Sequence, residues 1–209
     1  MSEPLEQPIE RRTRVLEVVT VVVLSITAVL TAWCGFEASK WGGEMSIAFS
    51  RASSARVQAA SAEATAQAAR QYDLTIYTQW VLADEEGNDE LVRFIEERFT
   101  DEFAVAFDAW NTEGRSARGP FAMPDYVPPG TVEAEKSSAR ADAQFDEALA
   151  NNQRGDDYSL LTVLFALVLF FAAISQHQTR EWGRRIFLAL SGVMAIVGIV
   201  TLLTFPIKL

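Results

Sequence analysis

Three long apolar runs constrain the fold of this 209-residue chain more than any other feature of its sequence. They cover residues 15–36, 158–176 and 186–207, and the only charged residue within them is Glu17, near the start of the first run. About 20 apolar residues in a helix cross the roughly 30 Å hydrocarbon core of a bilayer, whereas a buried helix of a soluble domain normally keeps a polar stripe. The runs therefore predict three transmembrane helices.

Basic residues beside these runs predict how the chain is oriented. They are Arg11, Arg12, Arg14, Arg180, Arg184 and Arg185. Because short cytoplasmic loops are enriched in Lys and Arg, we expect residues 1–14 and the loop 177–185 to be cytoplasmic. Residues 37–157 and the C-terminus are then expected on the outer side. We expect a multi-pass protein of a bacterial inner membrane with a periplasmic domain between its first and second transmembrane helices.

Negative charge is concentrated in the segment between the first and second runs. The whole chain has a formal net charge of −10, and residues 37–157 hold 11 basic and 23 acidic side chains, a net charge of −12. This balance argues against binding to nucleic acid, which needs clustered Lys and Arg. The acidic pairs of the segment also lack the regular spacing of a calcium-binding EF-hand loop. We interpret the charge as a solvated surface.

Small and apolar residues of this segment follow a seven-residue repeat that is typical of a coiled coil. We call these positions, with their continuation into the first apolar run, the seam. The outer part of the seam comprises Trp41, Met45, Ala48, Ala52, Ala55, Ala59, Ala62, Ala66, Ala69, Asp73, Ile76 and Trp80. Alanine at most of these positions predicts closely approached helices. Asp73 is the one charged member, and a polar residue at such a position can fix helix register or partner number.

The repeat continues backwards into the first apolar run. Its positions there include Thr20, Thr27, Thr31, Cys34 and Ala38. Small and hydroxylated side chains are common contact residues between membrane helices, so we predict one seam running from the membrane into the outer segment. Its partner helix could belong to the same chain or to another copy. The alternative is that a heptad arises by chance because alanine is common here.

The outer segment is expected to contain three helices and one long loop. We predict an alanine-rich long helix over 37–83, an amphipathic helix over 90–111, a Pro/Gly loop over 112–130 and a helix over 132–152. Apolar residues spaced three and four apart place the aromatic side chains of 90–111 on one face, which we expect to pack on the alanine-rich helix. A joint near Gly155 is expected to separate the last of these helices from the second transmembrane helix.

Residue types that carry catalysis or bind metals are scarce. The chain has one cysteine, Cys34, and one histidine, His177. These counts exclude a multi-histidine metal centre, a cysteine-rich zinc site and an intramolecular disulfide. The sequence also lacks a Gly-rich phosphate loop between a strand and a helix. We therefore expect a protein that is not an enzyme and that has no catalytic, cofactor-binding or metal site.

Three motifs stand out along the chain. They are the stretch 33–43 (WCGFEASKWGG), the pair Arg98-Phe99 followed by Phe103, Ala106-Phe107 and Trp110, and Asp157-Tyr158 at the start of the second apolar run. Together they resemble an uncharacterised bacterial family of small three-span inner-membrane proteins. The resemblance covers the chain from the first run to the third. It implies one anchor before and two after an outer helical domain, and it implies no particular activity.

These features favour an all-α membrane protein whose three transmembrane helices carry a long-helix, coiled-coil-like extracytoplasmic domain between the first and the second. We expect it to act as an oligomerisation or interaction module, either as a homo-oligomer or as a subunit of a larger membrane complex. Its expected partners are the lipid bilayer and itself or another membrane protein, and not nucleic acid. The alternative is a passive oligomeric channel whose pore is lined by Thr20, Thr27 and Thr31.

Overall fold

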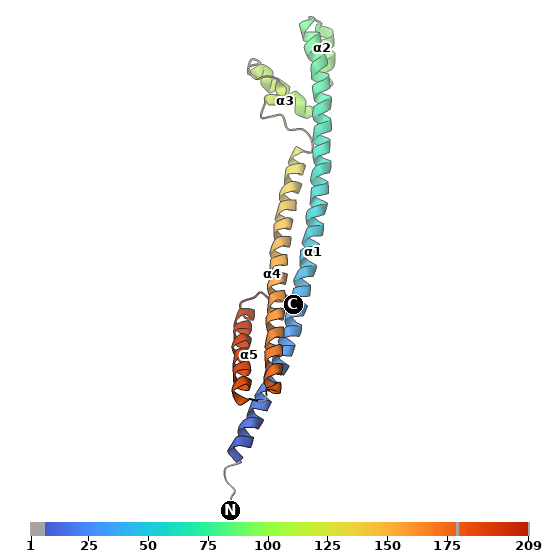
Figure 1. Ribbon diagram of the computed structural model, residues 1–209. Coiled ribbons are helices and arrows are strands. Elements are labelled where there is room, and N and C mark those ends of the chain that lie inside the picture. Colours follow the sequence, from blue (N-terminus) through green and yellow to red (C-terminus); the bar gives the residue numbers. More distant parts are fainter. Residues whose placement is uncertain (1–6, 179, 209) are drawn as a thin grey trace, which may run out of the picture. The chain divides into compact units, whose positions relative to one another are not determined.

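Helices form all the regular structure in the described part of the chain (Figure 1). The computed structural model describes residues 7–178 and 180–208, and side chains from Glu17 onward. The elements are α1 (Gln7–Glu85), α2 (Asp89–Glu96), α3 (Asp101–Thr112), the short 3-10 helix η1 (Pro120–Ala122), α4 (Thr131–His177) and α5 (Glu181–Leu202). The expectation of an all-α protein is therefore confirmed.

Three of these helices, α1, α4 and α5, are long and apolar enough to span a membrane. The helices α1 and α4 each contain a whole apolar run, and α5 contains residues 186–202 of the third. The length of α1 follows from its composition, because its only proline, Pro8, lies in the first turn. At that position the backbone N–H has no partner within the helix, so its absence costs little.

The chain divides into two compact units. The terminal unit consists of Met1–Ala48 and Asp146–Leu209, and the middle unit consists of Phe49–Phe145. The helices α1 and α4 contribute residues to both units. The helices α2 and α3 belong to the middle unit, and α5 belongs to the terminal unit.

In the terminal unit, α4 packs against both α1 and α5 through glycines. A Cβ added at Gly155 of α4 would lie 3.5 Å from the carbonyl oxygen of Ala38 in α1. A Cβ added at Gly198 of α5 would lie 2.8 Å from Cε1 of Phe165 in α4. Glycine lets helix backbones approach closely, so both positions set the spacing between helices. The buried cluster that these contacts enclose comprises Cys34, Trp41, Tyr158, Leu161 and Phe165.

An aromatic cluster forms the core of the middle unit. Its buried members are Trp80, Ala83, Ile95, Phe103, Ala106, Phe107, Trp110, Met123 and Tyr126. The rings of Trp80 and Phe107 meet edge to face with centroids 4.8 Å apart, a geometry that adds to the gain from burial alone. The aromatic face of α3 therefore packs on the end of α1 around Trp80. This region belongs to the predicted alanine-rich helix 37–83, as expected, but the contact is largely ring against ring instead of ring against alanine.

The alanine-rich part of α1 packs instead on α4 within the middle unit. Gly130, just before α4, lies so close to α1 that a Cβ there would collide with the carbonyl oxygen of Ala62. Further along, the rings of Phe49 and Phe145 make an edge contact with centroids 5.5 Å apart. The alanines thus allow a close approach between two helices of one chain.

The helix predicted over 90–111 is interrupted, which corrects the sequence expectation. It forms α2 and α3, with a break between Glu96 and Asp101. The Thr100 side chain accepts a hydrogen bond from the Phe103 backbone N–H at 3.3 Å and so caps the start of α3. Ile95 of α2, Phe99 in the break and Phe103 of α3 are spaced four residues apart and all pack in the aromatic cluster. The hydrophobic pattern therefore continues across the break and gives no sign of it.

The expected joint near Gly155 is absent, because α4 runs without interruption from Thr131 to His177. Two hydrogen-bonded side-chain pairs one turn apart support the helix here, Asn152 with Asp156 at 3.0 Å and Gln153 with Asp157 at 2.9 Å. Glycine costs a helix interior only about 1 kcal/mol, and the contact of Gly155 with α1 offsets that cost.

The boundaries of the last two segments also differ from expectation. The loop predicted over 177–185 is shorter, since α4 ends at His177 and α5 begins at Glu181. The helix of the third predicted transmembrane segment, 186–207, ends earlier than expected, since α5 ends at Leu202. Pro206 explains the early end, because its ring disfavours helical geometry in the residue before it.

Candidate functional site

The seam lies on the inner side of α1 in the terminal unit. Thr20, Thr27, Cys34, Trp41 and Ala48 are buried there, and Thr31, Ala38 and Met45 are half-buried. The Thr31 hydroxyl donates a hydrogen bond to the Thr27 carbonyl oxygen at 2.8 Å. Thr20 and Thr27 are only 1% and 2% exposed, so they face the interior of their own chain. A pore between several copies would need them on its outer surface.

The seam is also covered in the middle unit. Ala52, Ala55, Ala66, Asp73 and Trp80 are buried, and Ala59, Ala62, Ala69 and Ile76 are half-buried. Gly130 covers the stretch around Ala62, and the aromatic cluster covers Trp80. Within each unit, therefore, the seam has neighbours from the same chain.

Asp73, the charged member of the seam, is fully buried and bound by two side chains. Its Oδ1 accepts a hydrogen bond from the Thr100 hydroxyl at 2.8 Å, and its Oδ2 accepts one from the Tyr126 hydroxyl at 2.9 Å. A buried carboxylate is costly unless hydrogen bonds compensate its lost hydration. Asp73 therefore fixes the start of α3 and the loop that follows it against α1.

This arrangement raises the pKa of Tyr126. Burial raises the pKa of its hydroxyl, and the hydrogen bond to Asp73 and the negative charge of that residue raise it further. The nearby Arg70 acts in the opposite direction. Tyr126 therefore stays a neutral donor, which Asp73 requires as its partner.

A second buried carboxylate, Glu37, lies in the terminal unit and was not identified as a candidate from the sequence. Its side chain is fully buried, and its Oε2 accepts a hydrogen bond from the Lys208 backbone N–H at 3.0 Å. Its Oε1 has no hydrogen-bond partner among the described residues. The sequence does contain a signal, because Glu37 is three residues after Cys34 and four before Trp41, which places it on the buried side of α1.

Glu37 is surrounded by groups that hold the segment after α5. The Tyr158 hydroxyl donates a hydrogen bond to the Pro206 carbonyl oxygen at 3.0 Å. Lys208 Nζ lies 3.5 Å from a carboxylate oxygen of Glu44 and 5.5 Å from the ring centre of Trp41. These contacts fix the chain after α5 to α1 and α4. We call Glu37, Trp41, Tyr158 and Lys208 the carboxylate site.

Trp41 is a second buried aromatic residue of this site, beside Tyr158. The guanidinium of Arg154 lies 4.7 Å from its ring centre, a distance typical of a cation–π contact. Its indole Nε1 is buried without a hydrogen-bond partner in the described chain. Buried polar atoms in this position commonly bind an ordered water or another small polar group.

Of the other residues singled out from the sequence, Cys34 is buried beside this site, in the same cluster as Trp41 and Tyr158. His177 lies apart from it, exposed at the end of α4. Arg180 and Arg185 are exposed, Arg184 is half-buried, and Arg185 pairs with Glu181 at 3.2 Å. The side chains of Arg11, Arg12 and Arg14 lie outside the described residues.

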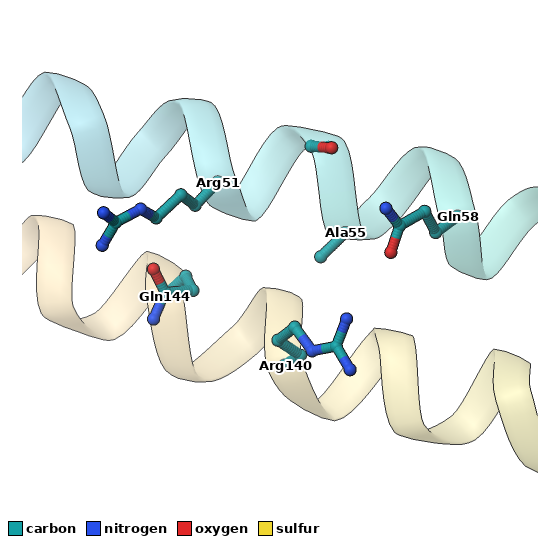
Figure 2. A pocket seen from close by; sticks show the side chains of 6 residues that line it. Arg51, Ala55, Gln58, Arg140 and Gln144 are labelled. Carbon is teal, nitrogen blue, oxygen red and sulfur yellow. The ribbon is translucent and has the colours of Figure 1, made fainter.

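A groove between α1 and α4 opens on the surface of the middle unit. Its volume is about 360 Å³, and it is lined by Arg51, Ser54, Ala55, Gln58, Arg140 and Gln144. Figure 2 shows Arg51 on α1 and Arg140 on α4 extending along the groove in opposite directions, Arg51 on the side of Gln144 and Arg140 on the side of Ala55 and Gln58. The lining therefore offers guanidinium, amide and hydroxyl donors and includes no carboxylate.

Within the described residues, no three His, Cys, Asp or Glu side chains gather in a way that could hold a metal ion. The fold and these sites define a helical protein with three helices suited to a membrane. No protein-family model, curated protein or solved structure is significantly similar to this chain.

Proposed function

We propose that the chain is a non-enzymatic, multi-pass protein of a bacterial inner membrane that acts as an interaction module. It works as a homo-oligomer or as a subunit of a larger membrane complex. Its N-terminus lies in the cytoplasm, and its C-terminus and residues 37–157 lie outside. The basic residues beside the apolar runs support this orientation, and the strong negative charge of residues 37–157 suits a solvated domain.

An exposed aromatic patch on the middle unit is the observation that carries the proposal. The patch comprises Tyr72, Leu91, Phe94 and Arg98. Phe94 and Tyr72 are 52% and 50% exposed, and Leu91 lies one turn before Phe94 on α2. Exposed Tyr, Phe and Arg side chains that lie together are typical of protein interfaces.

The patch is ordered before any partner binds. The guanidinium of Arg98 lies 3.4 Å from the ring centre of Phe94 and donates a hydrogen bond to the Phe94 carbonyl oxygen at 2.6 Å. The Tyr72 hydroxyl donates a hydrogen bond to the Arg98 carbonyl oxygen at 3.3 Å. Side chains already held in place lose less entropy on association, which favours binding.

The seam supports the proposal less directly than the sequence suggested. Its residues have neighbours from the same chain in both units, so the patch offers a free surface for a partner and the seam does not. Burial of Thr20 and Thr27 likewise favours an interaction module over the alternative of a threonine-lined channel.

Site-specific photocrosslinking in native membranes tests the proposal. The full chain would carry the photoreactive residue p-benzoylphenylalanine at Phe94, and a matched protein would carry it at Val57, which is also apolar, 67% exposed and part of the middle unit. We expect a crosslinked product from position 94 and none from position 57. A product of twice the chain mass indicates a homo-oligomer, and another mass indicates a different subunit.

A second measurement gives the proposal a clear negative outcome. Native mass spectrometry of the purified protein in lipid nanodiscs reports the mass of the assembly. A monomer at high concentration, together with no crosslink at position 94, contradicts the proposal. A Phe94→Ser variant should shift any assembly towards the monomer while the helical content stays unchanged.

A further inference from the structure

Carboxylates border the aromatic patch on α2. Glu90 precedes Phe94 by four residues, and Glu97, the residue at the end of the helix, follows Phe94 by three. Residues at these spacings are neighbours on the surface of a helix, so both carboxylates lie on the same face as the Phe94 ring. Both side chains are exposed. The rim of the patch is therefore negatively charged.

The chain on either side of α2 adds to this charge. Residues 84–102 hold nine acidic and two basic side chains, a net charge of −7. Only two of these carboxylates form ion pairs in the described chain, Glu97 with Arg98 at 3.9 Å and Asp84 with Arg115 at 3.1 Å. Most of the negative charge around the patch is therefore left uncompensated by the protein itself.

A second copy of the chain suits this surface poorly. In a two-fold symmetric dimer the patch would meet itself, and Glu90 and Glu97 of each copy would approach the same carboxylates of the other. Like charges brought together across an interface weaken association. The clustered arginines of the chain lie beside its apolar runs and are cytoplasmic in the proposed orientation, so they cannot compensate these carboxylates.

We infer that the aromatic patch binds a basic amphipathic segment of another protein, in which Lys or Arg residues flank apolar side chains. The inference rests on the proposed interaction function and specifies its partner. The apolar side chains of such a segment would cover Leu91 and Phe94, and its cations would meet Glu90 and Glu97. Aromatic residues supply much of the binding energy at protein interfaces, and complementary charge at the rim speeds association and selects the partner.

A defined peptide tests this inference on the full chain in phosphatidylcholine nanodiscs. The probe is an amphipathic helix of Leu and Lys with about 14 residues, roughly four turns, and the matched peptide has Glu in place of every Lys. The protein would carry p-benzoylphenylalanine at Phe94 or, as a control, at exposed Val57. We expect a crosslink to the Leu–Lys peptide from position 94 only, and none to the Leu–Glu peptide from either position.

Neutral variants test whether the carboxylates at the rim attract the peptide. Fluorescence anisotropy of the labelled Leu–Lys peptide would measure its affinity, with empty nanodiscs as the blank for peptide bound to lipid. The double variant Glu90→Gln, Glu97→Gln should weaken binding by about fivefold, since two exposed charge pairs are lost. Both side chains are exposed, so circular dichroism should show unchanged helical content.

A second double variant removes the same charge elsewhere in the middle unit. Glu135→Gln, Asp142→Asn changes two exposed carboxylates of α4. Glu135 lies against residues 59–63 of α1, which are about 13 Å or more from Tyr72 along that helix. This distance exceeds the roughly 8 Å over which charges act at physiological salt, so binding should change less than about twofold.

Several results would overturn the inference. Absence of a crosslink between position 94 and the Leu–Lys peptide is one, and equal weakening by the two double variants is another. A crosslinked product of twice the chain mass from position 94 in native membranes would also overturn it, because a second copy then occupies the patch. That last result would leave the proposed interaction function intact, whereas a monomer with no crosslink at position 94 contradicts both.

Discussion

The Tyr126 hydroxyl donates a hydrogen bond to Asp73 Oδ2 at 2.9 Å, across 53 residues of sequence. The bond connects the Pro/Gly loop to the inner side of α1. With the second bond from Thr100, it accounts for a charged residue in a seam composed otherwise of small, apolar and hydroxylated side chains. The polar residue specifies which part of the chain packs at this level of α1, in the way that one buried polar group specifies pairing in coiled coils.

Removing the Tyr126 hydroxyl should therefore destabilise the protein. We expect Tyr126→Phe to lower the free energy of unfolding by about 1–3 kcal/mol, because one oxygen of buried Asp73 loses its donor. The measurement is chemical unfolding of the full chain in mixed micelles. Tyr72→Phe is the control, since the Tyr72 hydroxyl is exposed and its removal should cost less than about 0.5 kcal/mol. Equal losses in the two variants would contradict the role given to Asp73.

Stability should also fall at alkaline pH through the same residue. The pKa of Tyr126 is raised in the folded protein above its ordinary value near 10, so the unfolded chain loses this proton first. The stability that the neutral hydroxyl contributes is complete below about pH 10 and is lost as the pH rises through the raised folded pKa. The free energy of unfolding should be measured from pH 9 to 11 for the native chain and for Tyr126→Phe. The difference between the two should become smaller as the pH rises. A constant difference over this range would argue against the prediction.

Glu37 should tolerate loss of its charge better than loss of its side chain. Glu37→Gln keeps an oxygen for the Lys208 backbone N–H and removes a buried charge that has one unpartnered oxygen, so we expect thermal stability equal to or above that of the native chain. Glu37→Ala leaves that N–H unpaired and opens a cavity, which should cost about 1–3 kcal/mol. If Gln proves as damaging as Ala, the negative charge itself is required.

Replacing glycine by alanine should change the stability of the protein in opposite directions at two positions. Gly130 has a φ of +93° and lies against the Ala62 carbonyl oxygen, so Gly130→Ala combines a strained backbone with a collision. We expect a loss of about 2 kcal/mol or more. Gly43 lies within α1 with open space around it, so Gly43→Ala should raise stability by roughly 0.5–1 kcal/mol. Melting curves of both variants in one detergent would show the opposite signs.

Sequence reasoning predicted the long helices better than their ends. The apolar runs predicted three helices suited to a membrane, because about 20 consecutive apolar residues are typical of a transmembrane helix. The hydrophobic spacing does not predict the break before Asp101, since capping by Thr100 leaves that spacing unchanged. Gly155 does not form a joint, because a tertiary contact with α1 offsets the poor helix propensity of glycine.

The candidate sites depend on contacts between distant segments more strongly than the helices do. The seam repeat contains Asp73 as its one charged member, and only the structure identifies Thr100 and Tyr126 as its partners. Glu37 looked like one of many acidic residues in an acidic segment. Its burial depends on the chain after α5, which no local pattern connects to it.

Sequence alone determined that this protein is helical, that three of its helices suit a membrane and that its negative charge lies between the first and the second. These properties follow from local composition and periodicity, which act over one or two helical turns. Tertiary structure decided which carboxylates are buried, as at Glu37 and Asp73, and which side chains hold them in place. The physical reason is that burial and pairing depend on residues brought together from distant parts of the chain, and a repeat along one helix does not encode its neighbours.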